Sequence, residues 1–189
     1  NVRMVGVGIS TVIQCSTASV HAVTARQVAG VQIANLKVES TTTTGDCLDI
    51  VECTDGLIDN GTTSGGNFGI RVETVAASGP TTDRMRVTRC TMSGAAQSGI
   101  LMYRCTDSTV ENCVCYSNGT TASHHGIYIS HPDTTRCAVI DCVAYSNSGA
   151  GIQLDGSKNQ VLGGRFYNNT SAGIFTWSNN PGSSETAYV

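Results

Sequence analysis

The chain has 189 residues, of which only 13% are charged, and its formal net charge at pH 7 is -3. This length suits one domain with a core of its own, and the charge argues against a basic face that would bind nucleic acid. No apolar run approaches the roughly 20 residues of a membrane-spanning helix, so we expect no membrane span.

A repeated Gly-Ile step organises the chain, which holds 21 Gly but only three Pro. Each step opens a short alternating segment that is typical of a β-strand, and an earlier copy surrounds Leu48. In chain order the predicted strands are 47–51, 69–73, 99–103, 126–130, 151–155 and 173–177. The spacing from Leu48 to Ile70, Ile100, Ile127, Ile152 and Ile174 is 22, 30, 27, 25 and 22 residues, which suits one coil of a solenoid.

A second pattern runs between these strands. It reads Val-x-x-Cys at 87–90, 110–113 and 139–142, continues as Val-x-x-Gly at 161–164, and has weaker copies that start at Ile33 and Ile58. Repeats that carry two or three short strands each cannot bury their apolar sides alone. The two patterns therefore predict an all-β chain whose repeats stack in parallel around one continuous core.

Two segments also resemble a known family. Residues 110–118, Val-Glu-Asn-Cys-Val-Cys-Tyr-Ser-Asn, and their copy at 139–147 resemble the Ile-x-Asn-Asn-x-Ile-x-x-Asn coils of right-handed parallel β-helices, the pectin-lyase-like proteins and phage tailspikes. Residues 1–13 are similar to the first coil of such proteins. The resemblance implies a single-stranded right-handed parallel β-helix of about seven coils.

The resemblance also suggests how the chain is organised. We expect one β-helix domain over 1–189, with a first coil at 1–30, regular coils at 31–178 and a C-terminal tail at 179–189. The family's usual N-terminal capping helix is absent, and an uncapped solenoid end exposes strand edges. We therefore expect a fragment of a longer chain or one chain of an oligomer.

The nine cysteines are expected to be free and largely buried, because a chain this long can be stabilised by its own core. Cys90, Cys113 and Cys142 fall in one row, followed by Gly164, where relatives often place an asparagine ladder. A row of thiols along the solenoid axis indicates packing, since a metal site needs ligands that converge on one point. We predict no metal site and no cofactor.

Three further groups have structural explanations. Tyr116, Tyr145 and Tyr167 are predicted to stack in successive coils, with a sugar platform as the alternative. Asp55, Asp107 and Asn159 fall at one offset and are explained by Asx-type turns. The pair His124-His125 lies in a loop that could cover a groove, although adjacent histidines are more often solvated.

The outer face of the Gly-Ile strands holds the candidate functional residues. Side chains alternate along a strand, so the residue after each inward Ile points outward. Three outer rows follow: Asp49, Arg71, Leu101, Tyr128, Gln153 and Phe175; then Val51, Glu73, Tyr103, Ser130, Asp155 and Trp177; then, at the bend, Glu52, Thr74, Arg104, His131, Gly156 and Ser178.

This face combines the only Trp of the chain with other aromatic, acidic and basic residues. Aromatic rings stack on sugar rings, while carboxylates and guanidinium groups hydrogen-bond to hydroxyls and uronates. We expect a groove for a polysaccharide; the alternative is that the aromatic residues pack under loops or against a neighbouring subunit. The predicted substrate-binding residues are Tyr103, Trp177, Phe175, Arg71, Glu52 and Gln153.

One predicted catalytic set comprises Tyr128, His131, Arg104 and Asp155, from three successive coils. β-Elimination from a uronate needs a base at C5, a cation near the carboxylate and an acid toward the leaving oxygen. Tyr128 or His131 could be the base or the acid, and Arg104 could neutralise the carboxylate. The set resembles the Tyr/His/Arg/Asp groups of alginate-active β-helices, but Ser130-His131-Pro132-Asp133 does not reproduce the Asp-Pro-His order of the epimerases.

An alternative catalytic pair is Glu73 with Asp49 or Glu52 in the adjacent coil. Strand geometry places Asp49 and Glu73 roughly 8 Å apart, a separation that suits an inverting glycosidase. Arg71 lies between these rows and could instead hold the acids in salt bridges.

Taken together, the sequence favours a phage-tailspike-like domain that binds and depolymerises a bacterial surface polysaccharide, located in a virion tail. A non-catalytic β-helical tail-fibre shaft or adhesin is the alternative, and a secreted bacterial polysaccharide lyase or epimerase is a third option. The expected partners are a polysaccharide and either two further copies in a homo-trimer or the rest of a longer chain.

Overall fold

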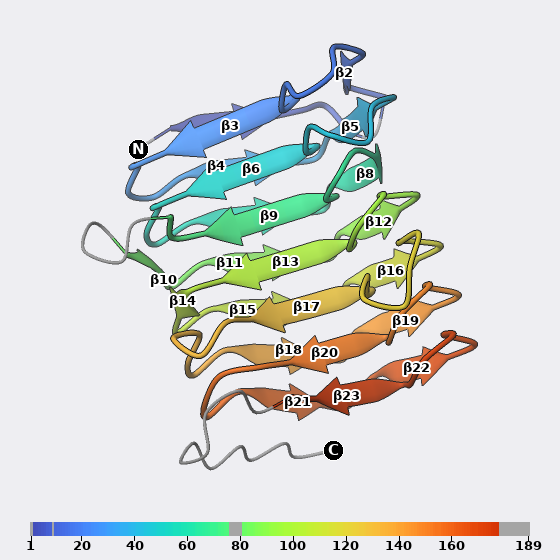
Figure 1. Cartoon of the computed structure of the whole chain (residues 1–189). Helices are drawn as coiled ribbons and strands as arrows, with labels where there is room; N and C mark the ends of the chain where they lie inside the picture. Colours follow the sequence, from blue (N-terminus) through green and yellow to red (C-terminus); the bar gives the residue numbers. More distant parts are fainter. Residues whose placement is uncertain (1, 9, 76–80, 178–189) are drawn as a thin grey trace.

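The computed structural model describes residues 2–8, 10–75 and 81–177. Within these ranges every regular element is a β-strand, and the strands form three parallel seven-stranded sheets, here named A, B and C (Figure 1). No helix long and apolar enough to cross a membrane occurs in this part of the chain. Ser178 and the expected tail at 179–189 lie outside the described residues.

The strands of each sheet come from successive repeats. Sheet A contains β1 (Arg3–Val5), β4 (Gln32–Ala34), β7 (Leu57–Asp59), β11 (Arg86–Thr88), β15 (Thr109–Glu111), β18 (Ala138–Ile140) and β21 (Gln160–Leu162). Sheet B contains β2 (Val12–Cys15), β5 (Lys37–Ser40), β8 (Thr62–Gly65), β12 (Thr91–Ser93), β16 (Val114–Tyr116), β19 (Val143–Tyr145) and β22 (Arg165–Tyr167). Sheet C contains β3 (Val23–Arg26), β6 (Leu48–Val51), β9 (Ile70–Glu73), β13 (Ile100–Tyr103), β17 (Ile127–Ser130), β20 (Ile152–Leu154) and β23 (Ile174–Thr176). A further two-stranded sheet pairs β10 (Thr82–Asp83) with β14 (Cys105–Thr106).

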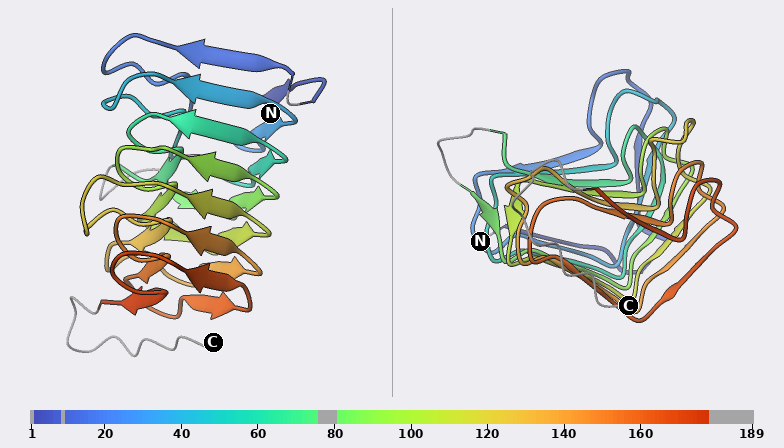
Figure 2. Two further views of the ribbon diagram at one scale, coloured as in Figure 1. Left: turned by 90° about the vertical axis from the view of Figure 1, so that its right-hand side faces the viewer. Right: turned by 60° about the horizontal axis from the view of Figure 1, so that its bottom comes forward.

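The chain visits sheets A, B and C in turn, and each passage makes one coil. Every strand of a sheet pairs in parallel with the equivalent strand of the next coil, so the seven coils stack along one axis (Figure 2). The predicted β-helix of about seven coils is therefore confirmed.

The predicted register of the Gly-Ile strands is also confirmed. Leu48 pairs with Ile70, and the same row continues through Ile100, Ile127, Ile152 and Ile174. Sheet C has a seventh strand, β3, which begins at Val23 without a Gly-Ile step and pairs with β6. The repeat pattern did not indicate this strand because its core positions are Val23 and Ala25.

Close approach between coils explains the glycine of the Gly-Ile steps at Gly69, Gly99, Gly126 and Gly151. A Cβ atom on Gly126 would lie 2.6 Å from the Gly151 carbonyl oxygen and 2.8 Å from Asn147 Nδ2. Gly99 and Gly151 face equivalent obstacles, with Asn118 Nδ2 at 2.9 Å and Asn169 Nδ2 at 2.8 Å. Real Cβ atoms do not approach other atoms this closely, so only Gly fits beside these asparagines.

These asparagines form a ladder inside the solenoid. Asn118 Nδ2 donates to Asn147 Oδ1 at 3.0 Å, and Asn147 Nδ2 donates to Asn169 Oδ1 at 2.9 Å. The prediction that the cysteine row occupies the family's usual ladder position is therefore wrong. The actual ladder lies two residues after each tyrosine of the Tyr116 row.

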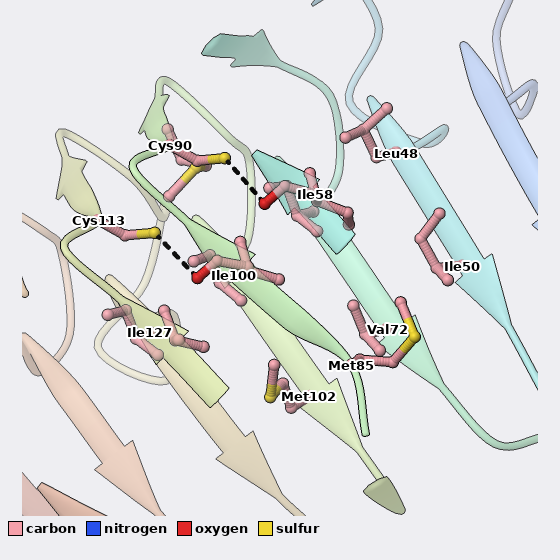
Figure 3. Packing of buried hydrophobic residues seen from close by; sticks show 14 of the residues in the cluster. Leu48, Ile50, Ile58, Val72, Met85, Cys90, Ile100, Met102, Cys113 and Ile127 are labelled. Carbon is pink, nitrogen blue, oxygen red and sulfur yellow. Dashed lines mark hydrogen bonds between the residues drawn. The ribbon is translucent and has the colours of Figure 1, made fainter. Parts of the chain in front are cut away.

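The core confirms the predicted cysteine and tyrosine rows. All nine cysteines are free, and all except Cys15 are buried. Figure 3 shows Cys90 and Cys113 within the apolar core, where their thiols donate to the carbonyl oxygens of Ile58 and Val87, respectively. On the outside of sheet B, the ring centroids of Tyr116 and Tyr145 are 5.2 Å apart, and those of Tyr145 and Tyr167 are 5.1 Å apart.

The bend between sheets C and A corrects one prediction. Asp55 and Asp107 adopt positive φ angles of 54° and 51°, as expected for turn residues. The other positions of this column have the same conformation, with φ angles of 50° at Arg84, 57° at Arg136 and 59° at Lys158. The predicted shared offset of Asn159 is wrong by one residue: Asn159 is buried, and its Oδ1 accepts from the Cys137 amide at 2.8 Å.

Candidate functional site on the outer face of sheet C

The outer rows of sheet C have the predicted register. Asp49 pairs with Arg71, Leu101 with Tyr128, and Gln153 with Phe175. Their exposure is lower than simple alternation suggests, because Asp49, Leu101 and Gln153 are only 2%, 8% and 6% exposed. The face is therefore partly covered, and a hollow lies over its last coils.

This hollow is a cavity of about 410 Å³ over β17, β20 and β23. Part of its wall comes from the loop between β16 and β17. The lining residues are Ala122, Ser123, His125, Tyr128, Gln153, Asp155, Ser171, Phe175 and Trp177. Phe175 and Trp177 are 39% and 51% exposed, with their rings at 85° to each other, and form two apolar walls.

Tyr128 and Asp155 meet at this cavity across two successive coils. Tyr128 Oη donates to Asp155 Oδ2 at 3.1 Å, and Gln153 Nε2 donates to Asp155 Oδ1 at 2.9 Å. Burial raises the pKa of Asp155 above its usual value although both hydrogen bonds favour the carboxylate. Burial is also the largest cause of the raised pKa of Tyr128, which therefore remains a neutral phenol at pH 7.

A second group surrounds His131 at the bend after β17. Arg104 Nε donates to His131 Nε2 at 3.2 Å, and Asp133 Oδ2 lies 3.4 Å from His131 Nδ1. The Tyr103 ring contacts the His131 ring edge-on at 4.9 Å, and the Arg104 guanidinium lies 5.5 Å from the centre of the Tyr103 ring. Burial and the charge of Arg104 lower the pKa of His131, so its imidazole is neutral at pH 7.

The bend that follows each strand of sheet C positions Arg104 and His131. Arg104 and His131 adopt positive φ angles of 53° and 90°, a conformation that turns the chain away from the sheet and is unfavourable for residues other than Gly. Asp155 is close enough to His131 to affect its pKa. The four residues Tyr128, His131, Arg104 and Asp155 are thus brought together by successive coils, as their sequence offsets indicate.

His125 also lines the cavity, although it was not among the predicted site residues. The expectation that adjacent histidines are solvated is wrong for this residue, which is 4% exposed. Its ring contacts the Tyr128 ring edge-on at 5.0 Å, and burial lowers its pKa to about 4. The only sequence signal was its position immediately before the Gly-Ile step of β17.

The acids of the alternative pair belong to a charge network nearer the N-terminal coils. Arg71 Nε lies 3.0 Å from both Asp49 Oδ1 and Asp46 Oδ2, and Arg71 Nη2 lies 3.6 Å from Glu73 Oε1. Asp46 and Asp49 are buried, and Arg71 supplies the positive charge that both carboxylates require. Burial raises the pKa of Glu73, whereas Arg71 opposes that shift.

The same network contains a possible set of metal ligands. His21, Asp46 and Asp49 each offer one ligand atom, all within 4.8 Å of one another. His21 Nδ1 lies 3.0 Å from Asp46 Oδ2, the oxygen that Arg71 also contacts. The guanidinium already provides a cation at these carboxylates, which disfavours a second one.

Glu52, another predicted substrate-binding residue, is 6% exposed at the bend after β6. Its carboxylate accepts a hydrogen bond from Gln27 Nε2 at 2.9 Å. It therefore lies apart from the cavity, in the N-terminal half of the face, with Arg71.

Two solved structures have a similar fold at low sequence identity, and a third matches with a lower TM-score. The A-module of mannuronan C-5 epimerase AlgE6 from Azotobacter vinelandii has a TM-score of 0.70 and 18% identity, over 89% of this chain and 49% of that one. The A-module of AlgE4 from the same organism has a TM-score of 0.67 and 18% identity, over 88% and 49%. ORF18 of Geobacillus virus E2 has a TM-score of 0.44 and 13% identity, over 86% and 42%. The chain thus spans about half the length of the solved structures that it resembles.

No curated protein sequence matches this chain significantly. A family model described as "Right handed beta helix region" matches residues 11–185, which include all coils from β2 onward. The chain therefore belongs to the right-handed β-helix family, in agreement with its seven stacked coils.

Proposed function

We propose that the chain binds a bacterial surface polysaccharide along the outer face of sheet C and cleaves it by β-elimination at a uronate, as a phage-tailspike-like domain. The observation that carries this proposal is the Tyr128–Asp155 contact at a cavity with two exposed aromatic rings, beside the Arg104–His131 pair. The aromatic walls suit the apolar faces of sugar rings, and the polar groups suit proton transfer.

The proposed chemistry assigns one task to each residue. Arg104 pairs with the uronate carboxylate and stabilises the charge that develops when C5 loses its proton. The uronate carboxylate competes with His131 for Arg104 and releases His131 Nε2. In the tautomer that carries its proton on Nδ1, toward Asp133 Oδ2, this Nε2 accepts the C5 proton. Tyr128 donates its phenolic proton to the leaving O4 as the C4–O4 bond breaks and a C4–C5 double bond forms. Asp155 positions the Tyr128 hydroxyl.

The structure favours this set over the hydrolase pair of Glu73 with Asp49. Asp49 is 2% exposed and is in contact with Arg71, so a water molecule and a sugar have little access to it. Hydrolysis at this pair would leave a new reducing end without the unsaturated product of elimination.

The test is incubation with a panel of capsular polysaccharides, O-antigens, pectate and alginate, in which ultraviolet absorbance reports unsaturated products and a second assay counts reducing ends. We expect absorbance to rise, and Tyr128→Phe and His131→Gln each to lower the rate by about 10²- to 10⁴-fold. Tyr116→Phe, in the tyrosine row of sheet B, is the matched control and keeps full activity. Reducing ends without absorbance would contradict elimination, and binding without either product would make the face a non-catalytic adhesin.

The pH profile provides a second readout. Because His131 must be neutral to accept a proton, activity should rise with pH through the lowered pKa of His131, below 6.5. It should then stay high until Tyr128 ionises, above its ordinary pKa of 10. An acid limb that is unchanged in His131→Gln would show that another group is the base.

The proposal also covers where the domain acts and what it assembles with. As a tailspike-like domain it would act in a virion tail, outside the infected cell, as part of a homo-trimer or of a longer chain. Secretion by a bacterium as a lyase or epimerase is the alternative.

A further inference from the structure

The charge of the cavity over β17, β20 and β23 differs from that of the neighbouring His131 group. Among the described residues that line it, none is Lys or Arg, and Asp155 is the only carboxylate. Arg104 lies at the His131 group instead, where its closest described carboxylate contact is a 3.9 Å approach to the exposed Asp133. Arg104 can therefore pair with the carboxylate of an anionic sugar. In the cavity, the same carboxylate would meet the like charge of Asp155.

The cavity is better suited to hydroxyl groups. The carboxylate of Asp155 accepts hydrogen bonds from Tyr128 and Gln153 and interacts with the His131 backbone amide, and its remaining lone-pair capacity can accept from a sugar hydroxyl. Phe175 and Trp177 offer apolar walls to the ring carbons. A second carboxylate placed among these groups would lose its hydration and meet Asp155 without a compensating cation.

His125 adds a hydrogen-bond donor with a defined direction. Its Nδ1 accepts from the Ala150 amide at 3.0 Å, so in the neutral imidazole the proton is on Nε2. The His125 amide donates to Ser98 Oγ at 2.9 Å, which fixes the backbone as well. Among the described residues, none accepts a hydrogen bond from Nε2, which leaves this N–H for a ligand.

Gly149, in the next coil, leaves the space that His125 occupies. A Cβ atom on Gly149 would lie 2.7 Å from His125 Nδ1 and 2.5 Å from the His124 carbonyl oxygen. The absence of a side chain at Gly149 thus lets the β16–β17 loop fold over the face and bring His125 to the cavity.

We propose that this cavity is a subsite for an uncharged sugar residue and that His125 Nε2–H donates a hydrogen bond to a hydroxyl or ring oxygen of that sugar. The inference rests on the proposed function and makes the substrate a heteropolysaccharide, in which an uncharged sugar lies next to the uronate held by Arg104.

The single tryptophan makes binding in this cavity measurable. Trp177 lines the cavity and is the only Trp of the chain, so a change in intrinsic fluorescence reports a sugar at this position. The full chain is titrated with uncharged oligosaccharides of glucose, galactose, mannose and N-acetylglucosamine, and with oligomers of galacturonate, guluronate and mannuronate of the same lengths. We expect at least one uncharged series to change the Trp177 emission, and the uronate series to bind at least tenfold more weakly.

Two substitutions at His125 separate the hydrogen-bond donor Nε2–H from the structural role of the side chain. His125→Asn keeps an acceptor near the position of Nδ1, for the Ala150 amide, but removes the Nε2 donor, whereas His125→Gln keeps an N–H donor near Nε2. We expect the Asn variant to raise the Kd of the uncharged sugar about tenfold, the value of one hydrogen bond. The Gln variant should stay within about threefold, as should the control His124→Asn.

Each contrary result has a distinct meaning. Uronate oligomers that bind at Trp177 more tightly than every uncharged series, or an unchanged Kd in folded His125→Asn, would overturn the subsite. Either result leaves polysaccharide cleavage at Arg104 and His131 standing if unsaturated products are still formed. Failure of every polysaccharide and oligosaccharide to bind would overturn both proposals.

Discussion

His125 illustrates how position determines the chemistry of a single residue. His124 and His125 are neighbours in the sequence, yet His124 remains half-buried in the loop while His125 lies almost fully buried beside Tyr128. Burial lowers the pKa of His125 to about 4, so the imidazole is a neutral hydrogen-bonding group across the physiological range. The same burial makes the residue a source of pH-dependent stability.

Acid should therefore destabilise the fold through His125. Its pKa is lowered in the folded state, from 6.5 to about 4, so its contribution to the free energy of unfolding is full above pH 6.5 and is lost as the pH falls toward 4. The lost contribution is on the order of 3 kcal/mol. Urea unfolding from pH 7 to pH 4 should show a shallower decline in His125→Asn than in the wild type by about this amount, while His124→Asn should follow the wild type. Parallel curves for the wild type and His125→Asn would contradict the burial of a neutral imidazole.

At the scale of the strand, the asparagine ladder and the glycines of the Gly-Ile steps depend on one another. Asn147 is 1% exposed, accepts from Asn118 Nδ2 at 3.0 Å and donates to the Cys115 carbonyl oxygen at 3.1 Å. The Gly126 backbone passes so close to Asn147 that a side chain at position 126 would collide with the amide. In the three coils that contain Asn118, Asn147 and Asn169, a buried polar column thus joins sheets B and C in addition to apolar packing.

Removal of one member of the ladder should be costly. Asn147→Ala leaves the Asn118 backbone N–H without its buried partner and removes one of the two hydrogen bonds at Asn118 Nδ2 and at Asn169 Oδ1. Each unsatisfied buried group costs about 1–3 kcal/mol. We expect the free energy of unfolding to fall by about 2–5 kcal/mol. Gln160→Ala, on the exposed side of β21, is the control and should change it by less than about 0.5 kcal/mol. Equal effects of the two substitutions in urea unfolding would show that the ladder contributes no stability.

At the scale of the whole molecule, seven coils enclose one continuous core in which thiols take the place of larger apolar groups. Cys90, Cys113 and Cys142 occupy successive coils, and each is at most 1% exposed. Burial raises the pKa of Cys47 to about 12, which suppresses the reactive thiolate there. Cys15, at the first coil, is only half-buried.

Thiol labelling should report the integrity of this core. In the native protein we expect one cysteine, Cys15, to react rapidly with a disulfide reagent such as Ellman's reagent, and all nine to react in urea. Cys15→Ser should abolish the rapid phase without altering the total measured after unfolding, apart from the one thiol removed. Several rapidly labelled thiols in the native wild type would contradict a closed core.

The amino-acid sequence by itself determined the repeating coils of the β-helix and their register. Gly-Ile steps and Val-x-x-Cys repeats predicted the register of sheet C, the buried cysteine row and the stacked tyrosines, because each follows from one residue type recurring at one offset. The sequence also placed Tyr128 and Asp155 in adjacent coils. It did not reveal the asparagine ladder, which was expected in the cysteine row but lies five residues after it, at Asn118, Asn147 and Asn169.

Only the tertiary structure decided which of the outer residues share an accessible site. Alternation along a strand says which way a side chain points but not what covers it, so Asp49 and Gln153 point outward and are nonetheless buried. Loop 117–126 folds back over the face because Gly149, in the next coil, leaves space for it, and His125 reaches the cavity as a result. Contacts of this kind join residues with no common offset, and they form only when the coils are stacked.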